Sequence, residues 1–275
     1  MTQKSEWTGR VGESWAHEWK RTDRSFGGLT DRLLQAATSS PFNQVVDVGC
    51  GAGEVSLLLA AANPSARVTG VDVSESLLAA ARLRGEGADN VAFVLGDASQ
   101  WEAGEGEAPD LIISRHGVMF FPEPVTAFEH LRSIARPGAR LVFSCFRERP
   151  DNKWAEQLTS VLGTGSSPAD PRAPGPFAFG EADYVEDILT RAGWTDVHLS
   201  PVDYEMVAGE GTDALEDAVS YFLRIGPAAR AISEMDAAER DRTMGRLREM
   251  LDAQSKAGRI TLPAASWIVT AKRAD

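Results

Sequence analysis

Metal-binding and disulfide-forming residues are scarce in this sequence. Only two of the 275 residues are cysteine, Cys50 and Cys145. They form no CxxC pair and have no supporting cluster of histidines, so no metal site is expected. Because a free cysteine commonly packs as a small apolar side chain, both thiols are predicted to lie buried at strand ends.

Long apolar runs and an excess of positive charge are missing as well. No stretch approaches the roughly 18 to 20 continuous apolar residues of a membrane-spanning helix, and the polar start MTQKSEWTGR lacks the apolar region of a signal peptide. We therefore expect a cytoplasmic protein without a membrane partner. The net charge of −12 argues against a nucleic-acid partner, since affinity for the phosphate backbone depends on clustered Lys and Arg.

The most informative stretch runs from Gln44 to Ala60 and reads QVVDVGCGAGEVSLLLA. A short β-forming run ends in Gly49, Gly51 and Gly53, and a helix-forming Leu/Ala run follows at once. In such a strand, turn and helix, the glycines let the backbone approach a ligand closely. The helix N-terminus offers the ligand free N–H groups. The stretch therefore predicts a nucleotide-cofactor site.

Strand-forming and helix-forming segments alternate along the first half of the chain. Strands are expected at residues 44–50, 67–73, 91–97, 110–116 and 140–146. With helices between them, these strands predict a doubly wound, mainly parallel α/β sheet. The last apolar run, SWIVTAKR, follows no crossover helix, so it is expected to pair antiparallel.

The remaining segments are expected to surround this sheet. Residues 1–40 are interpreted as an N-terminal helical lid, with an amphipathic helix from about Leu29, and residues 41–275 as the main domain. Insertions are expected at about 147–180, largely a loop rich in Gly and Pro, and at about 208–260, largely helical. The lid and the two insertions are therefore expected to surround the predicted cofactor site.

Two acidic residues stand at the carboxyl ends of successive predicted strands, where ligands bind in open α/β sheets. Asp72 is placed to accept hydrogen bonds from both hydroxyls of a ribose. Asp97 lies next to where an adenine would sit and can accept from its exocyclic amine. Either acid alone could be a helix cap, but both together with the glycine turn favour a cofactor.

Five motifs then support a family resemblance. They are DVGCGAGEVSLLLA, VTGVDVS, GDAS, DLIISRHGVMFF and LRSIARPGARLVFSCF, in this order. The series resembles class I S-adenosylmethionine-dependent methyltransferases, and the nearest group is the bacterial small-molecule enzymes similar to ubiquinone/menaquinone methyltransferases. The resemblance is strong over about 40–146 and weaker beyond. It implies a Rossmann-like seven-stranded sheet with an antiparallel last strand, S-adenosylmethionine as cofactor and S-adenosylhomocysteine as product.

The resemblance also implies which residues bind the cofactor. They are Asp47, Gly49, Gly51 and Gly53 beside the methionine portion, Asp72 and Val73 at the ribose, and Asp97 with Ala98 at the adenine. Arg115 either holds the cofactor carboxylate or pairs with a surface acid. Glu54 stands where the fingerprint of dinucleotide-binding enzymes has glycine, which favours the methyl donor.

His116 is the candidate catalytic residue. It follows the fourth strand in SRHG, where the related group more often has phenylalanine, and the family layout implies that it lies near the methyl group. A general base there would help if the acceptor were a hydroxyl or an acidic carbon. A histidine packed beside Phe120 and Phe121 as a pocket wall is the equal alternative.

The substrate is expected to contact the lid and the two insertions, which hold many aromatic residues. Such a lining predicts an apolar or aromatic small molecule, with Trp15, His17, Trp19 and Phe179 as candidate contacts. Trp15 and Trp19, four apart, would share one face of a helix. That face either packs on the main domain or covers the bound ligands.

The expected function is methyl transfer from S-adenosylmethionine to a small organic molecule, with oxygen or carbon ahead of nitrogen as the methylated atom. The alternatives are a methyltransferase for RNA or protein, and a regulator that binds S-adenosylmethionine without turnover. A homo-oligomer stays open as an assembly state.

Overall fold

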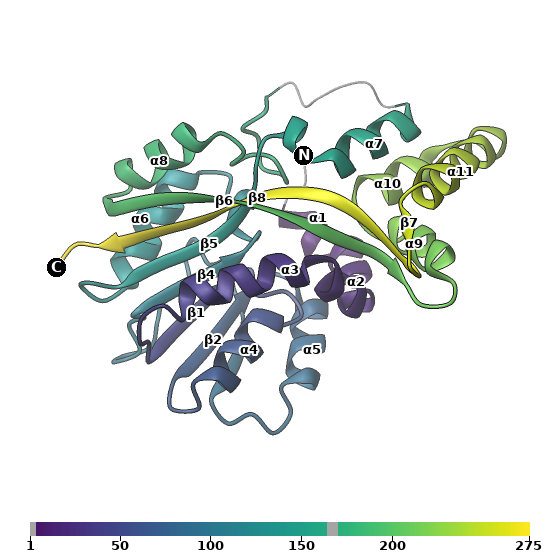
Figure 1. Cartoon of the computed structure of the whole chain (residues 1–275). Coiled ribbons are helices and arrows are strands. Elements are labelled where there is room, and N and C mark those ends of the chain that lie inside the picture. The colour runs from purple at the N-terminus through teal and green to yellow at the C-terminus, as the bar shows by residue number, and fades with distance from the viewer. Residues whose placement is uncertain (1–3, 164–169) are drawn as a thin grey trace.

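The computed structural model describes residues 4–163 and 170–275, and a central sheet with helices on both faces runs through it (Figure 1). The strands follow the spatial order β3-β2-β1-β4-β5-β8-β6. In that order they span Val91–Leu95, Arg67–Asp72, Gln44–Val48, Leu111–Arg115, Arg140–Phe146, Arg259–Arg273 and Trp194–Glu210, and the short β7, Ser255–Lys256, pairs with β8.

The directions of the strand pairs confirm the predicted topology. β1 pairs in parallel with β2 and β4, β2 with β3, and β4 with β5. β8 pairs antiparallel with both β5 and β6. The fold is therefore the expected Rossmann-like sheet, with its last strand antiparallel. The carboxyl ends of β1 to β5 meet at one edge, where ligands bind in such sheets.

Helices cover the sheet in two layers because crossover connections between parallel strands are right-handed. One layer contains α3 (Trp19–Ala37), α4 (Glu54–Ala62) and α5 (Glu75–Arg84), and the other contains α6 (Pro124–Ile134) and α8 (Ala182–Arg191) (Figure 1). Leu29 and Leu33 of α3 are fully buried. On the α6 side, Phe128 stacks on Phe143 with ring centroids 5.5 Å apart, and Trp194 donates from Nε1 to the Phe128 carbonyl at 3.0 Å.

The helix starts follow local sequence chemistry. Ser74 caps α5 as predicted, since its Oγ accepts from the Leu77 N–H at 3.4 Å. α6 begins with Pro124, whose missing N–H costs nothing in the first turn. Both helices therefore begin with residues suited to a first helical turn.

The N-terminal segment is more helical than the sequence indicates. α1 spans Lys4–Trp7, α2 spans Arg10–His17, and α3 begins at Trp19 rather than near Leu29. The early part of α3 lacks a clear apolar period because several of its polar residues form ion pairs with other elements instead of facing water.

The expectation that Trp15 and Trp19 share one helix face is wrong. Glu18 ends α2 and precedes α3, so the two tryptophans belong to different helices. Trp15 packs edge-on against Trp7 with ring centroids 5.6 Å apart, whereas Trp19 lies beneath the Arg84 guanidinium. The two rings therefore have separate neighbours.

The two insertions differ in how well they match the prediction. The segment 147–180 is only partly a loop: η2 (Arg149–Asp151) and α7 (Lys153–Leu162), which buries Trp154 and Leu158, precede residues 170–180, which form no helix or strand. Residues 164–169 of this segment lie outside the described residues. The second insertion is helical as predicted, with α9 (Ala214–Phe222), α10 (Gly226–Glu234) and α11 (Ala237–Asp252).

β6 and β8 continue past the end of β5 and carry the second insertion. β5 pairs with β8 from Ser266 to Lys272, but β6 pairs with β8 back to Arg259. The two long strands form a ribbon that reaches from the sheet to α9 (Figure 1). This ribbon places α9 beside the start of α3.

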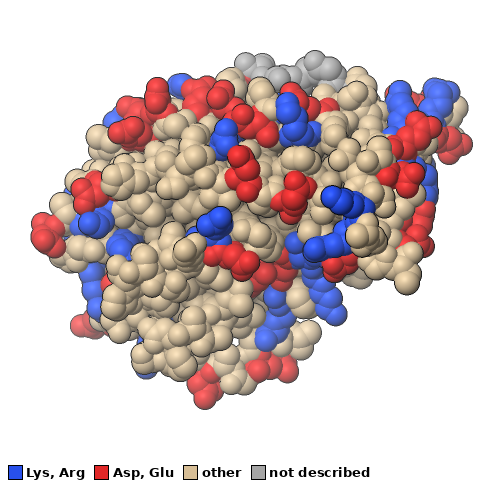
Figure 2. All heavy atoms as spheres, viewed as in Figure 1, with Lys and Arg blue, Asp and Glu red and all other residues tan. Residues whose placement is uncertain are grey.

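The visible surface carries mixed charge. On the face shown in Figure 2, Lys and Arg are interspersed with Asp and Glu. Such a face offers no basic tract for a phosphate backbone. Within residues 4–163 and 170–275, every helix is too short or too polar to cross a membrane.

The carboxyl ends of β1 and β4 approach each other with no side chain between them. Gly49 has a φ of 66°, and a Cβ added to it would lie 2.9 Å from the Gly117 Cα atom. A Cβ on Gly117 would lie 2.6 Å from the carbonyl oxygen of Val48. Ser114 Oγ donates to the same carbonyl at 2.7 Å. Both glycines are therefore needed for the strands to lie this close.

Gly49→Ala is expected to lower the free energy of unfolding by about 3 kcal/mol, since it adds left-handed strain of roughly 1–2 kcal/mol to overpacking of about 1–3 kcal/mol. Gly87→Ala is the matched control, because Gly87 has a φ of 86° and no described atom within 4 Å of the added Cβ. Urea unfolding measures both. Equal losses in the two variants would contradict the close approach of the strands.

Candidate functional site

The glycine turn after β1 leaves one position open. Gly49, Gly51 and Gly53 all have positive φ, at 66°, 55° and 84°. A Cβ on Gly53 would meet the Phe93 ring at 2.7 Å, but one on Gly51 would have no described atom within 4 Å. The space beside Gly49 and Gly53 is thus occupied by protein atoms, whereas Gly51 borders free space that a ligand can occupy.

Asp72 lies at the centre of the turn. One carboxylate oxygen accepts from the Gly51 N–H at 2.8 Å, and the other accepts from the Ser74 N–H at 2.9 Å. The side chain is 8% exposed. Burial raises the pKa of Asp72, while the N–H groups of Ser74, Gly51 and Val73 oppose the rise. Each oxygen keeps lone pairs that can accept from a further hydroxyl.

Asp47 lies deeper, at the end of β1. Its carboxylate accepts from the Ser56 hydroxyl at 2.6 Å, and it is 1% exposed. Burial raises the pKa of Asp47 to about 6, against the hydrogen bond from Ser56 and the charge of Arg115. Ser56 on α4 was not singled out from the sequence, since a serine in a Leu/Ala run carries no signal of its own.

Asp97 and Ala98 follow β3 at the same edge of the sheet. Asp97 accepts from the N–H of Ser99 at 3.0 Å and from its hydroxyl at 2.7 Å. Val73 is partly buried next to Asp72, and Ala98 is buried. The structure therefore brings the turn, Asp72 and Asp97 to one edge, with oxygens suited to hydroxyl and amine donors.

Arg115, at the end of β4, is held by carboxylates. Its Nη1 pairs closely with Glu54 and donates to Thr30 Oγ1 at 2.7 Å, and its Nη2 lies 3.4 Å from Asp23. Asp23 also pairs with Arg84 at 2.7 Å. Arg115 thus follows the second interpretation from the sequence, pairing with acids, although these acids are partly buried at the site and not freely exposed on the surface.

The same network joins α3 to the glycine turn. Arg84 donates to the carbonyl oxygen of Ala52 at 2.7 Å while it pairs with Asp23 of α3. Burial, and then the nearby Glu54 carboxylate, raise the pKa of Asp23 to about 6 against the two arginines. Neither Asp23 nor Arg84 was picked out from the sequence, because their pairing is visible only once α3 lies over the sheet edge.

The N-terminal helices cover this edge. Gly12 of α2 packs so tightly on α5 that an added Cβ would lie 2.2 Å from Ser74 Oγ. Trp7 contacts both Trp15 and Phe120, with ring centroids 5.6 and 5.2 Å apart. Of the residues expected to meet substrate, Trp15 lies in this cover, while the His17 side chain is 72% exposed.

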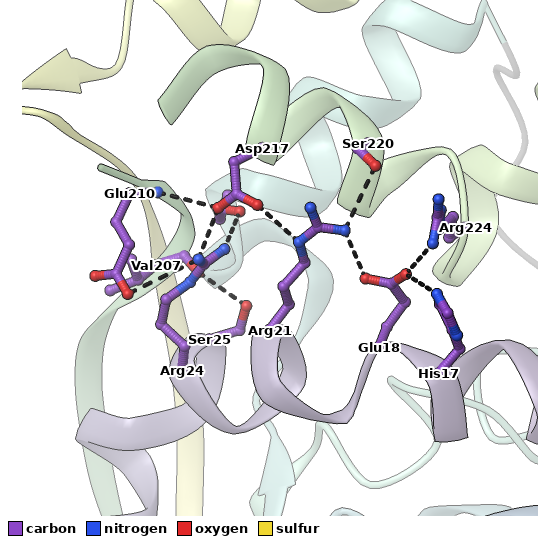
Figure 3. A network of polar contacts seen from close by, with 11 residues as sticks. His17, Glu18, Arg21, Arg24, Ser25, Val207, Glu210, Asp217, Ser220 and Arg224 are labelled. Carbon is purple, nitrogen blue, oxygen red and sulfur yellow. Dashed lines mark hydrogen bonds and ion pairs between the residues drawn. The ribbon is translucent and has the colours of Figure 1, made fainter. Parts of the chain in front are cut away.

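Ion pairs tie α3 to the second insertion (Figure 3). Asp217 of α9 accepts from Arg21 Nε and Arg24 Nη1, both at 2.7 Å. Glu18, only 3% exposed, accepts from Arg21 and from Arg224, again at 2.7 Å each. Arg21 is therefore shared between Glu18 and Asp217, which lie far apart in the sequence, and Arg24 adds a second ion pair to Asp217.

His116 follows β4 with a φ of 63° and is buried. Its ring stacks on Phe146 at a centroid distance of 4.2 Å and meets Phe26 edge-on at 5.2 Å. The expected neighbours, Phe120 and Phe121, lie elsewhere, against Trp7 and Phe128. The difference arises because β5 pairs beside β4 and carries Phe146 to the histidine.

The His116 ring is held neutral. Burial, and then the charge of Arg115, lower the pKa of His116 to about 3. Within the described chain, neither ring nitrogen has a hydrogen-bond partner. A neutral imidazole in this position can donate one hydrogen bond and accept one.

Phe179, another expected substrate contact, lies in the core. It is 1% exposed and packs against Phe128, Phe143 and Tyr184. Phe128 belongs to α6 and Tyr184 to α8, so this cluster occupies the layer opposite α3. Its position explains why an aromatic count alone cannot separate core residues from pocket residues.

Comparisons with known proteins agree with this geometry. A family model described as a methyltransferase domain matches residues 45–138. The ubiquinone biosynthesis O-methyltransferase of Hahella chejuensis is 30% identical over 166 residues, which cover 56% of this chain and 69% of that protein. The chain belongs to the class I S-adenosylmethionine-dependent methyltransferases. The family resemblance of the five motifs is thereby confirmed.

Two further proteins are similar to this methyltransferase over most of its length. The trans-aconitate 2-methyltransferase of Paracidovorax citrulli is 29% identical over 217 residues, covering 75% of this chain and 82% of that protein. The structure of phosphoethanolamine N-methyltransferase 2 from Haemonchus contortus, solved in complex with S-adenosyl-L-methionine, superposes with a TM-score of 0.60 at 14% identity. The superposition covers 100% of this chain and 61% of that chain, and it shows that the two proteins share a fold.

Asp217→Asn is expected to lower the free energy of unfolding of this methyltransferase by about 1–3 kcal/mol, because it weakens two charged hydrogen bonds to partly buried arginines. It should also speed hydrogen exchange in α9 and in the first turns of α3. Glu216→Gln is the matched control, since its neighbouring pair with Arg248 is half exposed and should contribute within about 1 kcal/mol. A loss no larger than that of the control would contradict a role for Asp217 in holding α3.

His116 should make the fold acid-sensitive. Its folded pKa of about 3 lies below the ordinary 6.5, so below pH 6.5 the unfolded chain binds a proton that the folded chain does not. From this residue the free energy of unfolding should fall as pH drops from 6.5 toward 3, by about 1.4 kcal/mol per pH unit.

His116→Asn removes this titration and suits the left-handed backbone, so its slope of unfolding free energy against pH between 4 and 6 should be shallower than that of the unsubstituted protein. Chemical denaturation at a series of pH values measures the slopes. His17→Asn is the control on an exposed histidine. Identical slopes for His116→Asn and the unsubstituted protein would show that His116 takes up a proton equally in both states.

Proposed function

We propose that this methyltransferase transfers the methyl group of S-adenosylmethionine to an oxygen atom of a small organic molecule, with carbon as the second choice. The observation that carries the proposal is the open cradle at Gly51, whose N–H is bound by the buried Asp72 carboxylate. A backbone without a side chain beside an acid that can accept from ribose hydroxyls suits a nucleoside cofactor.

The residues fit S-adenosylmethionine in the following way. Asp47, Gly49, Gly51 and Gly53 surround the methionine portion, Asp72 and Val73 meet the ribose, and Asp97 and Ala98 meet the adenine. In this proposal Arg115 does not bind the cofactor carboxylate. It pairs with Glu54 and Asp23, and so fixes α3 and the start of α4 around the turn. It is a positioning residue.

When bound, S-adenosylmethionine supplies an electrophilic methyl group, so the protein has mainly to align the acceptor with it. Such alignment is worth roughly 7–11 kcal/mol. The N-terminal helices α1 to α3 act as a lid that excludes water from the aligned groups. A base with a pKa of about 3 removes a proton poorly near neutral pH, so His116 lines the acceptor site and holds the acceptor by hydrogen bonds.

The names of the similar proteins support a small acceptor and oxygen chemistry. One is named for ubiquinone biosynthesis and O-methylation, another for trans-aconitate, and a third, from Methylococcus capsulatus, for O-methylation of malonyl-[acyl-carrier protein]. The aromatic lining around His116 favours an apolar or aromatic acceptor over these acids, and this preference is developed below.

Gly51→Ala tests the proposed cofactor site. The added methyl group would project into the cradle, so the affinity for S-adenosylhomocysteine in titration calorimetry should fall by about tenfold or more. Gly106→Ala is the matched control, because Gly106 has a φ of 79° and equally open surroundings among the described atoms. It should keep full affinity.

If the unsubstituted protein binds neither S-adenosylmethionine nor its product, the proposal fails. Binding without release of S-adenosylhomocysteine from any acceptor in a broad screen would instead favour the regulator without turnover. Release that depends on added RNA or protein would favour the macromolecular alternative.

A further inference from the structure

We propose that the acceptor is an uncharged, planar aromatic molecule that carries at least two hydroxyl or carbonyl groups, and that it binds between α3 and the strands β5, β8 and β6. This inference rests on the proposed function and specifies its substrate class. The juxtaposition that supports it is a group of buried polar atoms, set among aromatic rings, that have no hydrogen-bond partner of good geometry within the described residues.

The unpaired atoms come from four elements and the turn after β4. In the described part of the chain they include Thr22 Oγ1, both ring nitrogens of His116, and the hydroxyls of Ser144, Tyr204 and Ser266, each without a partner of good geometry. Folded proteins leave few buried polar atoms unpaired, and such atoms usually bind a ligand or an ordered water. Several gathered in one region indicate a site built for a polar ligand.

Strand register gathers three of these residues on one face of the sheet. Phe146 of β5 lies opposite Ser266 of β8, which in turn lies opposite Val202 of β6. Ser144 and Tyr204 are each two residues from a member of this row, so their side chains point to the same face. The Ser266 hydroxyl lies close enough to Tyr204 to moderate the rise in the pKa of Tyr204 caused by burial.

α3 brings the remaining residues to that face. Phe26 meets the His116 ring edge-on, and a Cβ on Gly28 would lie 3.7 Å from the Cβ atom of Tyr204. Thr22 stands one turn before Phe26, on the same side of α3. The hydroxyls of Ser25 and Thr22 also lie near Tyr221 of α9 and oppose the rise in its pKa caused by burial.

Aromatic rings form the other walls. Phe146 stacks on His116 and contacts Trp154 and Phe177 with centroid distances of 5.4 and 5.8 Å. Trp154 and Phe177 stack on one another at 5.9 Å. Flat rings in succession suit a planar ligand, since aromatic pairs favour stacked and edge-to-face contacts.

The arginines that α3 and β4 bring to this region are already compensated, and Arg149, over the Phe177 ring, donates to Thr159 Oγ1 at 2.9 Å. Arg115 is paired with Glu54 and Asp23, and Arg21 and Arg24 are paired with Asp217. His116 is neutral. A carboxylate placed among these groups would therefore be buried without a counter-charge, which is costly, whereas a hydroxyl or carbonyl would pair with the free hydroxyls. The site thus selects an uncharged acceptor.

The test compares two probes on protein saturated with S-adenosylhomocysteine. One is a dihydroxynaphthalene, and the other is the dihydroxynaphthoate that differs from it by one carboxylate. Titration calorimetry should show that the uncharged probe binds at least about tenfold more tightly, as expected for an uncompensated buried charge. Equal or tighter binding of the naphthoate, or no binding of the uncharged probe, would overturn the inference.

Ser266→Ala and Tyr204→Phe each remove one unpaired hydroxyl. Both should weaken binding of the dihydroxynaphthalene by roughly three- to tenfold while the melting temperature stays level or rises, because neither hydroxyl has a partner of good hydrogen-bond geometry among the described residues. Ser25→Ala is the stability control: its Oγ donates to the Val207 carbonyl at 2.9 Å, so this variant should melt at a lower temperature.

The outcomes separate the two proposals. If both hydroxyl variants bind the probe as the unsubstituted protein does, the unpaired atoms hold ordered water only, and the acceptor assignment fails. If the unsubstituted protein does not bind S-adenosylhomocysteine, the proposed function itself is refuted. Retained S-adenosylhomocysteine binding without probe binding would refute only the acceptor class.

Discussion

The burial of Arg115 is the constraint on which the rest of the site depends. A guanidinium cannot leave water without partners, and here the partners are Glu54 at the start of α4 and Asp23 on α3. α3 therefore has to lie across the carboxyl edge of the sheet, next to the glycine turn. The same charge helps to keep the neighbouring His116 neutral, so one buried cation shapes both the cover of the site and its chemistry.

The two halves of α3 are held to the rest of the molecule in different ways. Leu29 and Leu33, in the later part of the helix, are buried against the sheet, and this contact behaves like any apolar core. The earlier part is attached by Arg21 and Arg24 to Asp217, with side chains that keep some contact with water. Ion pairs of this kind are worth less than apolar burial when water can compete. The start of α3 is therefore held less firmly than its later part.

The parts of the fold that could be predicted from sequence are those governed by local patterns. Strand ends, the glycine turn and the cap at Ser74 depend on residues that are neighbours in the chain, and the antiparallel last strand follows from a missing crossover helix. The start of α3 was not predictable in this way. Its polar residues, such as Arg21, find partners in a distant segment, which hides the apolar period that marks a helix. α7 was missed for another reason: its buried residues do follow a helical period, but the Gly and Pro that come after it in the sequence indicate a loop.

The same division explains why the cofactor residues could be named from the sequence and the acceptor residues could not. Gly51, Asp72 and Asp97 each follow a strand in a motif, and the parallel sheet brings them to one edge. Ser144, Tyr204 and Ser266 meet only because β8 inserts between β5 and β6 in one register. A slip of one residue would turn their side chains to the other face of the sheet. Acceptor specificity in this methyltransferase is thus encoded in a long-range register, and no short motif can report it.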